Sequence, residues 1–277
     1  MTLAAGVTAA AVVPRLYSET CGDGDAAPLV LLHGWGMNLR VFDALVAPLS
    51  AHYRVTVIDL PGHGASPWHA QLAGSQWLAG LVPLLPRAAT LVGWSLGGQL
   101  ALQLASQQGL AVRRLVLIAT SARFVQSPDW PAGLPAATLR ALAAQLERDA
   151  SRTIADILAD FLELQVRGSL DAAAVRMGLQ QALQRHGMAQ PLALRAGLAL
   201  LEHNDLRELA RRIDMPALVI AGQHDRVTPP AAAQALVRLL PQGELLQIPR
   251  AGHAPFLSHP AAVAAALLDF MRADARP

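Results

Sequence analysis

The chain has 277 residues, of which 53% are hydrophobic and 15% charged, with a formal net charge of +2. A chain of this length buries a large core without disulfides, and one α/β domain often has this size. The single cysteine, Cys21, excludes an internal disulfide and a cysteine-rich metal site, and it fits a reducing compartment such as the cytoplasm.

The sequence contains no lysine, so all 22 basic residues are arginine. This absence excludes Schiff-base and pyridoxal chemistry and any phosphate loop that depends on a lysine. The arginines are scattered among acidic residues rather than clustered with aromatic ones. We therefore expect no nucleic-acid partner.

The first residues, Leu3 to Val13, form an alanine-rich and mildly apolar segment. A secretory signal would carry positive charge before such a run, whereas the first arginine, Arg15, follows it. We interpret the segment as an irregular start that leads into a first strand. No run approaches the roughly 20 apolar residues of a membrane span, so we expect a soluble cytoplasmic protein with no membrane partner.

Short apolar runs alternate with helical patterns over the first 120 residues. Four runs are continuous rather than alternating, which is typical of strands buried on both faces. They are Leu29–Leu32, Val55–Ile58, Thr90–Val92 and Leu115–Ile118, and helical spacing separates them at 40–50, 71–85 and 96–108. This order predicts a doubly wound, mostly parallel α/β sheet.

The alternation stops after the fourth strand run. From 121 to 213 the sequence has only helical stretches punctuated by prolines, and the strand pattern resumes at Ala217–Ile220. A helix at 230–240, a strand at 244–248 and a helix at 260–272 follow. We therefore predict an α/β core of residues 1–120 and 214–277, with a helical lid inserted at 121–213.

The segment Gly93-Trp94-Ser95-Leu96-Gly97 carries the strongest chemical signal, because G-x-S-x-G here follows a predicted strand and precedes a helix. A nucleophile at such a turn needs flanking glycines, since side chains there would collide with neighbouring backbone. The following helix points its first N–H groups at developing negative charge. We predict that Ser95 is a catalytic nucleophile rather than a simple helix start.

A serine hydroxyl needs a base, and in this arrangement the chain order is Ser, then Asp or Glu, then His. His253 follows the last predicted strand and Asp225 follows the strand at 217–221, each at the carboxyl end where open sheets assemble sites. Asp205 and Asp214 precede that strand. We predict that His253 is the base and that Asp225 fixes its tautomer, with a purely structural turn aspartate as the alternative.

The tetrahedral oxygen requires backbone donors. His33-Gly34-Trp35-Gly36 follows the first strong strand and matches the HG-x-G loop, which supplies one N–H, here that of Trp35; the second comes from Leu96. Each donor of this kind contributes about 10²–10³ in rate. We interpret His33 as a structural hydrogen-bonding residue. These parts specify acyl transfer to water, with no metal and no organic cofactor.

Several motifs together narrow this interpretation. They are H-G-W-G at 33–36, D-L-P-G-H-G-x-S at 59–66, G-W-S-L-G-G at 93–98, D-W-P at 129–131, F-L-x-L-Q at 161–165 and G-H-A-P-F-L-S-H-P at 252–260. The chain resembles the α/β-hydrolase superfamily, and in particular the pimeloyl-[acyl-carrier protein] methyl ester esterases of biotin synthesis, the BioH family. The resemblance covers most of the chain from Leu29 onward and implies an α/β-hydrolase fold.

That family removes the methyl ester from pimeloyl-[acyl-carrier protein], so the resemblance implies this reaction. By position, Ser95, Asp225 and His253 match the family's triad. The positions that match its substrate site are Trp35, Ser95, Leu96, Phe161, Leu162, Glu163, Leu164, Gln165 and His253. Ordinary packing inside the lid is the alternative role for the apolar lid members of this set.

The family's lid also presents arginines to the acidic carrier protein. The candidates here are Arg140, Arg148, Arg152, Arg167 and Arg176. Acidic residues are interleaved with them, so a solvated face is the alternative. A general short-chain carboxylesterase without a carrier partner is the second functional hypothesis, and a non-catalytic ligand-binding relative is the third. We expect a monomer; the sequence leaves acyl length open.

Overall fold

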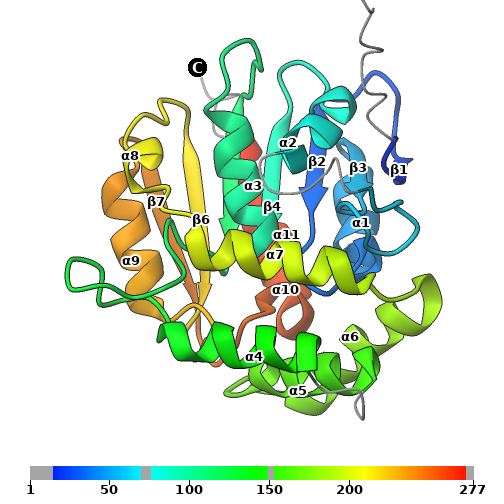
Figure 1. Ribbon diagram of the computed structural model, residues 1–277. Helices are drawn as coiled ribbons and strands as arrows, with labels where there is room; N and C mark the ends of the chain where they lie inside the picture. The colour runs from blue at the N-terminus through cyan, green and yellow to red at the C-terminus, as the bar shows by residue number, and fades with distance from the viewer. Residues whose placement is uncertain (1–14, 70–75, 149–152, 273–277) are drawn as a thin grey trace, which may run out of the picture.

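The computed structural model describes residues 15–69, 76–148 and 153–272, and Figure 1 shows a central sheet with helices around it. In the described chain seven strands form this sheet, in the order β1-β3-β2-β4-β5-β6-β7. The strands are β1 (Ser18–Cys21), β2 (Pro28–Leu32), β3 (Arg54–Ile58), β4 (Thr90–Trp94), β5 (Arg114–Ile118), β6 (Ala217–Gly222) and β7 (Gly243–Ile248). The predicted mostly parallel α/β-hydrolase sheet is confirmed, because only the β1–β3 pair is antiparallel.

Both faces of the sheet are buried, which explains the continuous apolar runs. Val30 and Leu32 of β2 pack in one hydrophobic cluster, whereas Leu29 and Leu31 pack in the other. Successive strand residues point to opposite faces, so a strand covered on both sides needs apolar residues throughout.

Helices cover each face. The core helices are α1 (Asp43–Ser50), α2 (Gln76–Leu81), α3 (Leu96–Ala105), α9 (Pro230–Leu239), α10 (Pro255–Ser258) and α11 (Pro260–Arg272), with 3₁₀ turns η1 (Leu39–Phe42) and η3 (Val82–Leu84). Helices α3 and α9 pack on one face, and α1 and α11 pack on the other. The helix predicted at 40–50 begins as the turn η1, and part of the helix predicted at 71–85 lies outside the described residues.

The segment between β5 and β6 is helical. It contains α4 (Ala136–Arg148), α5 (Ile154–Val166), α6 (Ala172–His186), α7 (Pro191–His203) and α8 (Arg207–Ala210). Figure 1 shows α4, α5 and α6 gathered on one side of the sheet. The loop before α4 has two isolated bridges, Val125–Leu134 and Ser127–Trp130, and no longer strand. The boundaries of this lid remain a prediction.

The strand β1 had no apolar run to predict it. Its sequence is Ser-Glu-Thr-Cys, and it pairs only with β3 at the edge of the sheet, where half of it is exposed. The interpretation of Leu3–Val13 lies outside the described residues. In the described part of the chain, no helix has the length and apolar character to cross a membrane.

Candidate active site

Ser95 lies at the turn between β4 and α3 in a strained backbone conformation, with φ 56° and ψ −117°. Glycines on either side make this turn possible. A Cβ on Gly93 would lie 2.3 Å from the carbonyl oxygen of Gly97, and a Cβ on Gly97 would lie 2.2 Å from that of Leu32. Because these glycines have no side chain, α3 packs closely against β2, and the turn holds Ser95 at the carboxyl end of the sheet.

The predicted acid and base meet Ser95 in the structure. The Nε2 atom of His253 lies 3.0 Å from Ser95 Oγ, and its Nδ1 atom lies 2.8 Å from Oδ2 of Asp225. All three side chains are buried. Asp225 follows β6 and His253 follows β7, so neighbouring parallel strands deliver both groups to one edge. The spacing fits a base that takes the serine proton while a carboxylate orients its ring.

Thr228 also belongs to this site, although none of the sequence motifs indicated it. Its hydroxyl donates to Asp225 Oδ2 at 2.7 Å and lies 3.4 Å from His253 Nδ1. The N–H groups of Val227 and Thr228 donate to Asp225 Oδ1 at 2.8 and 2.9 Å. Because Asp225 receives these donors besides the histidine, its carboxylate is held in one orientation. The position of a threonine three residues after the predicted acid was the available signal.

The backbone of His253 is held from two sides. Its carbonyl accepts the indole N–H of Trp94 at 2.8 Å, and its N–H donates to the carbonyl of Gln165 in α5 at 3.1 Å. The next contact, Gly252 N–H to Ser169 Oγ at 3.2 Å, also reaches the segment after α5. The loop that carries His253 is thus hydrogen-bonded to the helical insertion as well as to the end of β4.

The geometry of the loop after β2 supports Trp35 as an oxyanion donor. The carbonyl of Gly34 accepts the Nδ1–H of His33 at 2.8 Å. In a trans peptide the C=O and the following N–H point in opposite directions, so the N–H of Trp35 points away from that ring. A Cβ on Gly34 would lie 3.2 Å from Ser95 Cβ. The N–H of Leu96 is the first of α3 and has no acceptor inside the helix.

Two neutral histidines hold this loop. His33 Nε2 accepts the N–H of Leu60 at 3.0 Å, which leaves the proton on Nδ1 for Gly34. His63 Nε2 accepts the N–H of Gly36 at 3.3 Å. Burial, together with the neighbouring His63, lowers the pKa of His33 well below its usual range, and burial lowers the pKa of His63 to about 4. Both rings act as structural groups, in agreement with the interpretation of His33.

A cavity of about 180 Å³ opens beside Ser95. Its apolar lining includes Phe124, Leu139, Leu142, Phe161, Leu164 and Leu198. These residues come from the loop after β5 and from α4, α5 and α7. A mostly apolar cavity with polar chemistry at one end fits a hydrocarbon chain that ends in an ester.

The five residues at 161–165 do not share one environment. Phe161 and Leu164 line the cavity, and the Trp35 ring packs edge-on against Phe161 with centroids 4.8 Å apart. Leu162 packs in the hydrophobic cluster that contains Leu29 and Leu31 of β2. Glu163 is exposed and forms an ion pair with Arg176 of α6. The Gln165 side chain is buried, and the backbone carbonyl of Gln165 accepts the N–H of His253. Only Phe161 and Leu164 of this segment therefore contact the cavity.

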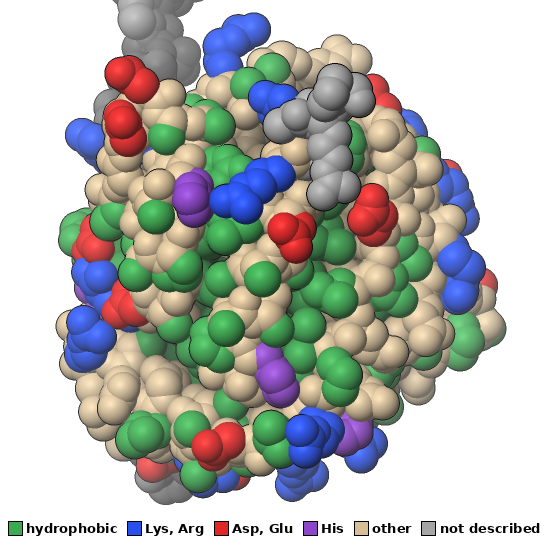
Figure 2. All heavy atoms as spheres, turned by 180° about the vertical axis from the view of Figure 1, so that it is seen from behind, with side chains coloured by type: hydrophobic (Ala, Val, Ile, Leu, Met, Phe, Trp, Pro, Cys, Tyr) green, Lys and Arg blue, Asp and Glu red, His purple; other side chains and the backbone are tan. Residues whose placement is uncertain are grey.

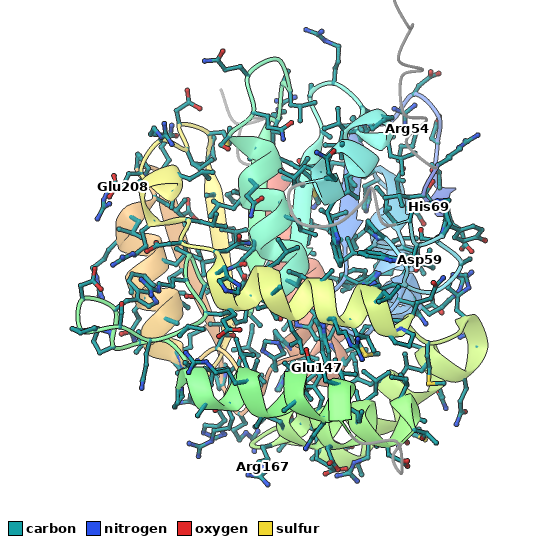
Figure 3. The ribbon with its side chains drawn as sticks, viewed as in Figure 1. Arg54, Asp59, His69, Glu147, Arg167 and Glu208 are labelled. Carbon is teal, nitrogen blue, oxygen red and sulfur yellow. The ribbon has the colours of Figure 1, made fainter. Side chains whose placement is uncertain are left out.

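The candidate docking arginines differ in their surroundings. Arg140 pairs with Glu202 at 3.0 Å, and Arg176 pairs with Glu163. Arg167 is exposed just after α5, at the outer edge of the insertion in Figure 3. The side chain of Arg148 and all of Arg152 lie outside the described residues. On the face in Figure 2, arginines lie in small groups among acidic and apolar side chains rather than in one basic surface.

The fold and this site define an α/β hydrolase in which a serine, a histidine and an aspartate are arranged for nucleophilic catalysis. A family model described as "alpha/beta hydrolase fold" matches residues 27–260. A bromoperoxidase from Bacillus anthracis has the same fold, with a TM-score of 0.81 at 23% identity over 93% of this chain and 95% of that one.

Curated relatives carry a more specific name. A pimeloyl-[acyl-carrier protein] methyl ester esterase of Nitrosomonas europaea is 41% identical over 88% of this chain and 95% of its own length. A protein of the same name from Xanthomonas campestris pv. campestris is 40% identical over 93% of this chain and 99% of its own. The chain belongs to the α/β-hydrolase fold family, among the pimeloyl-[acyl-carrier protein] methyl ester esterases.

Proposed function

We propose that this enzyme hydrolyses the methyl ester of pimeloyl-[acyl-carrier protein] to the free acid and methanol, in biotin synthesis. The observation that carries the proposal is the apolar cavity that ends at a complete Ser95–His253–Asp225 arrangement. The names of the relatives supply the substrate. The methylated pimeloyl chain fits the cavity, because it is long and apolar and carries its reactive ester at one end.

The geometry supports a two-step reaction. Ser95 Oγ attacks the ester carbonyl while His253 Nε2 takes its proton, and the N–H groups of Trp35 and Leu96 stabilise the oxyanion. The intermediate collapses, and methanol leaves with the proton from His253. Water then attacks the acyl-enzyme, again with His253 as base, and the acid is released.

Carrier docking forms part of the proposal. Arg140 and Arg167 are exposed on the insertion that forms the cavity wall, where they would face an acidic carrier protein. Arginine pairs well with carboxylates and phosphates. We also propose a cytoplasmic monomer. The single cysteine, Cys21, fits a reducing compartment, and light scattering on the purified chain tests the oligomeric state.

The experiment compares kcat/KM for methyl pimeloyl on acyl-carrier protein with kcat/KM for free monomethyl pimelate. We expect the carrier-bound ester to be strongly preferred, and the preference to weaken with salt because exposed charges are screened within about 10 Å at 0.1 M ionic strength. Equal values, with faster turnover of short nitrophenyl esters, would instead support a general carboxylesterase. Ser95→Ala is the control, since its kcat should fall at least about 10⁴-fold.

A further inference from the structure

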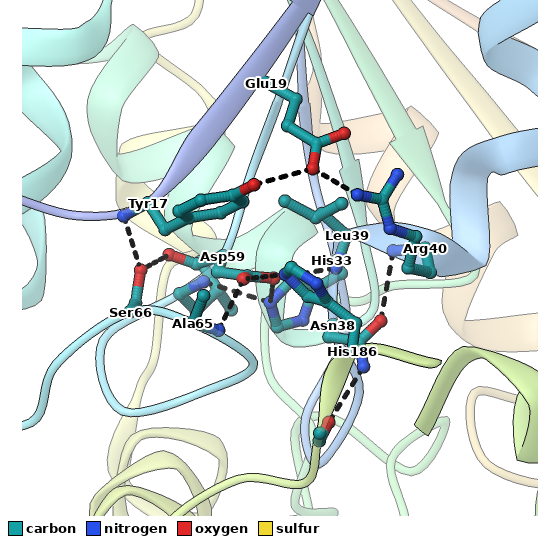
Figure 4. Close-up of polar contacts among 12 residues, drawn as sticks. Tyr17, Glu19, His33, Asn38, Leu39, Arg40, Asp59, Ala65, Ser66 and His186 are labelled. Carbon is teal, nitrogen blue, oxygen red and sulfur yellow. Dashed lines mark hydrogen bonds and ion pairs between the residues drawn. The ribbon is translucent and has the colours of Figure 1, made fainter. Parts of the chain in front are cut away.

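The last residue of α6, His186, contacts a buried carboxylate of the core (Figure 4). Its Nε2 atom lies 2.7 Å from Oδ2 of Asp59, the residue that follows β3. Asp59 is fully buried, and the His186 side chain is 12% exposed. The Tyr17 ring covers His186, with centroids 5.2 Å apart. A buried carboxylate requires donors on its oxygens, so His186 supplies a contact that Asp59 needs.

Asp59 joins this helix to the segment that follows the oxyanion loop. Its Oδ1 accepts the N–H of Leu39, the first residue of η1, at 2.9 Å, and its Oδ2 accepts the N–H of Ala65 at 2.9 Å. Burial raises the pKa of Asp59, and these two N–H groups oppose that rise. One carboxylate therefore links η1, the 59–66 loop and α6.

The turn from α6 to α7 is fixed at the same place. The side-chain amide of Asn38 donates to the carbonyls of Ala182 and Gly187, each at 2.9 Å. The N–H of Gln190, just before α7, donates to the carbonyl of Gly62 at 2.8 Å. Together with the histidine contact, these bonds determine where α7 begins relative to the core.

Helix α7 in turn lies directly on the two proposed oxyanion residues. The indole N–H of Trp35 donates to the carbonyl of Leu194 at 2.8 Å. A Cβ on Gly197 would lie 2.7 Å from Trp35 Cδ1 and 3.2 Å from Leu96 Cδ2. With so little space, a small shift of α7 must move one or both of these residues.

We propose that His186 is a positioning residue for the esterase reaction. Through Asp59 it fixes the α6–α7 turn, and through that turn it seats α7 against Trp35 and Leu96, whose N–H groups stabilise the oxyanion. The inference rests on the proposed ester-hydrolase function and adds to it a residue outside the cavity. It requires no particular acyl chain, so a short nitrophenyl ester is a suitable substrate.

The expected effect falls on kcat. An oxyanion donor contributes about 10²–10³ in rate, and misplacement by about 1 Å costs up to about 10²-fold. We expect His186→Ala to lower kcat about tenfold, with KM changed less than about twofold, because the lost interaction belongs to the transition state. His186→Gln retains an N–H donor and should recover most of kcat.

The measurement is kcat and KM on p-nitrophenyl acetate, expressed per active site titrated with a fluorophosphonate. This normalisation separates positioning from a mere loss of folded enzyme. The matched control is Arg185→Ala, one residue earlier on α6. Arg185 also bridges to the core, but through an exposed 3.1 Å pair with Asp43. Its kcat per site should equal that of the wild type.

A second variant covers the case in which His186→Ala does not fold. His186→Phe keeps a ring against Tyr17 but offers no hydrogen-bond donor to Asp59, so it should show the same loss in kcat. The inference fails if either folded variant retains wild-type kcat per site, or if Arg185→Ala loses as much as His186→Ala. Retained turnover in Ser95→Ala would instead overturn the proposed function itself.

Discussion

At the scale of single residues, the site depends on how firmly Asp225 is held. Four donors reach its two oxygens: two backbone N–H groups, the Thr228 hydroxyl and His253 Nδ1. The carboxylate cannot rotate without losing several of them. His253 therefore meets Ser95 in one tautomer and one orientation before substrate arrives, which is the pre-organisation that acyl transfer requires.

Thr228→Val tests this arrangement. The substitution keeps the shape of the side chain but removes the hydroxyl from Asp225 Oδ2, and a hydrogen bond to a charged group contributes about 1.5–3 kcal/mol. We expect kcat to fall about tenfold with little change in KM, measured by steady-state kinetics on a nitrophenyl ester. Thr228→Ser keeps the hydroxyl and should stay near wild type; equal rates for Val and Ser would contradict the role.

Sequence alone predicted Ser95, Asp225 and His253 because chain order and strand ends carry that information. It could not predict Thr228, since the distance from its hydroxyl to Asp225 depends on how one turn folds. For the same reason, matching the segment 161–165 as a block could not separate Phe161, which lines the cavity, from Glu163, which pairs with α6 at the surface.

At the scale of elements, the β4–α3 turn depends on close backbone approach. The carbonyl oxygen of Leu32 lies only 2.2 Å from where a Cβ on Gly97 would be, so a side chain at position 97 would force α3 and β2 apart. This approach brings the first N–H groups of α3 next to the loop that carries Trp35. The relative position of the two proposed oxyanion donors thus depends on Gly97.

Gly97→Ala should therefore lower both stability and activity. Overpacking of this kind costs about 1–3 kcal/mol, and here the obstacle is backbone at 2.2 Å rather than a flexible side chain. Urea unfolding measures the loss as a lower midpoint. Gly24→Ala is the matched control, because a Cβ on Gly24 has nothing within 4 Å. A wild-type midpoint for Gly97→Ala would show that the turn can relax.

Uniform burial made the inner strands predictable, whereas the half-exposed β7 and the helices α9 and α11 were predicted from strand order and helical spacing. Strands β2 to β6 are almost entirely buried, so their composition is nearly continuous apolar sequence. Strand β1 escaped prediction because its sequence is polar and half-exposed, so no apolar run marks it, although it pairs with β3. The contacts of α7 with Trp35 and Leu96 were equally hidden, since they join distant segments.

At the scale of the whole molecule, the buried histidines couple stability to pH. In the folded protein His63 stays neutral down to about pH 4, whereas in the unfolded chain it takes up a proton below about pH 6.5. Between these values the unfolded state binds more protons than the folded state. The contribution of His63 to the free energy of unfolding is therefore complete above pH 6.5 and decreases as the pH drops towards 4. His33 acts in the same direction. Asp59 opposes the trend in acid, because burial raises its pKa.

The expected loss from His63 alone is on the order of 3 kcal/mol, from a shift between pKa 6.5 and about 4. Urea unfolding at about pH 7.5, 6, 5 and 4.5, which spans most of the interval between the two pKa values, measures it as a falling free energy of unfolding. His63→Gln offers an amide oxygen to the N–H of Gly36 without titrating, so its curve should be flatter. Parallel curves for the two proteins would assign the dependence to other groups.

The hydrogen bond that the His253 N–H donates to the Gln165 carbonyl has a consequence for how such enzymes diversify. The insertion between β5 and β6 supplies the wall of the cavity, and the same helix also supports the backbone of the base. The insertion therefore cannot be exchanged freely between enzymes. A transplanted segment must carry a helix in the place of α5 whose last turn presents a backbone carbonyl to the N–H of residue 253. Chimaeras that differ by one residue in the register of this helix should differ in kcat, so substrate range and catalytic competence are inherited together.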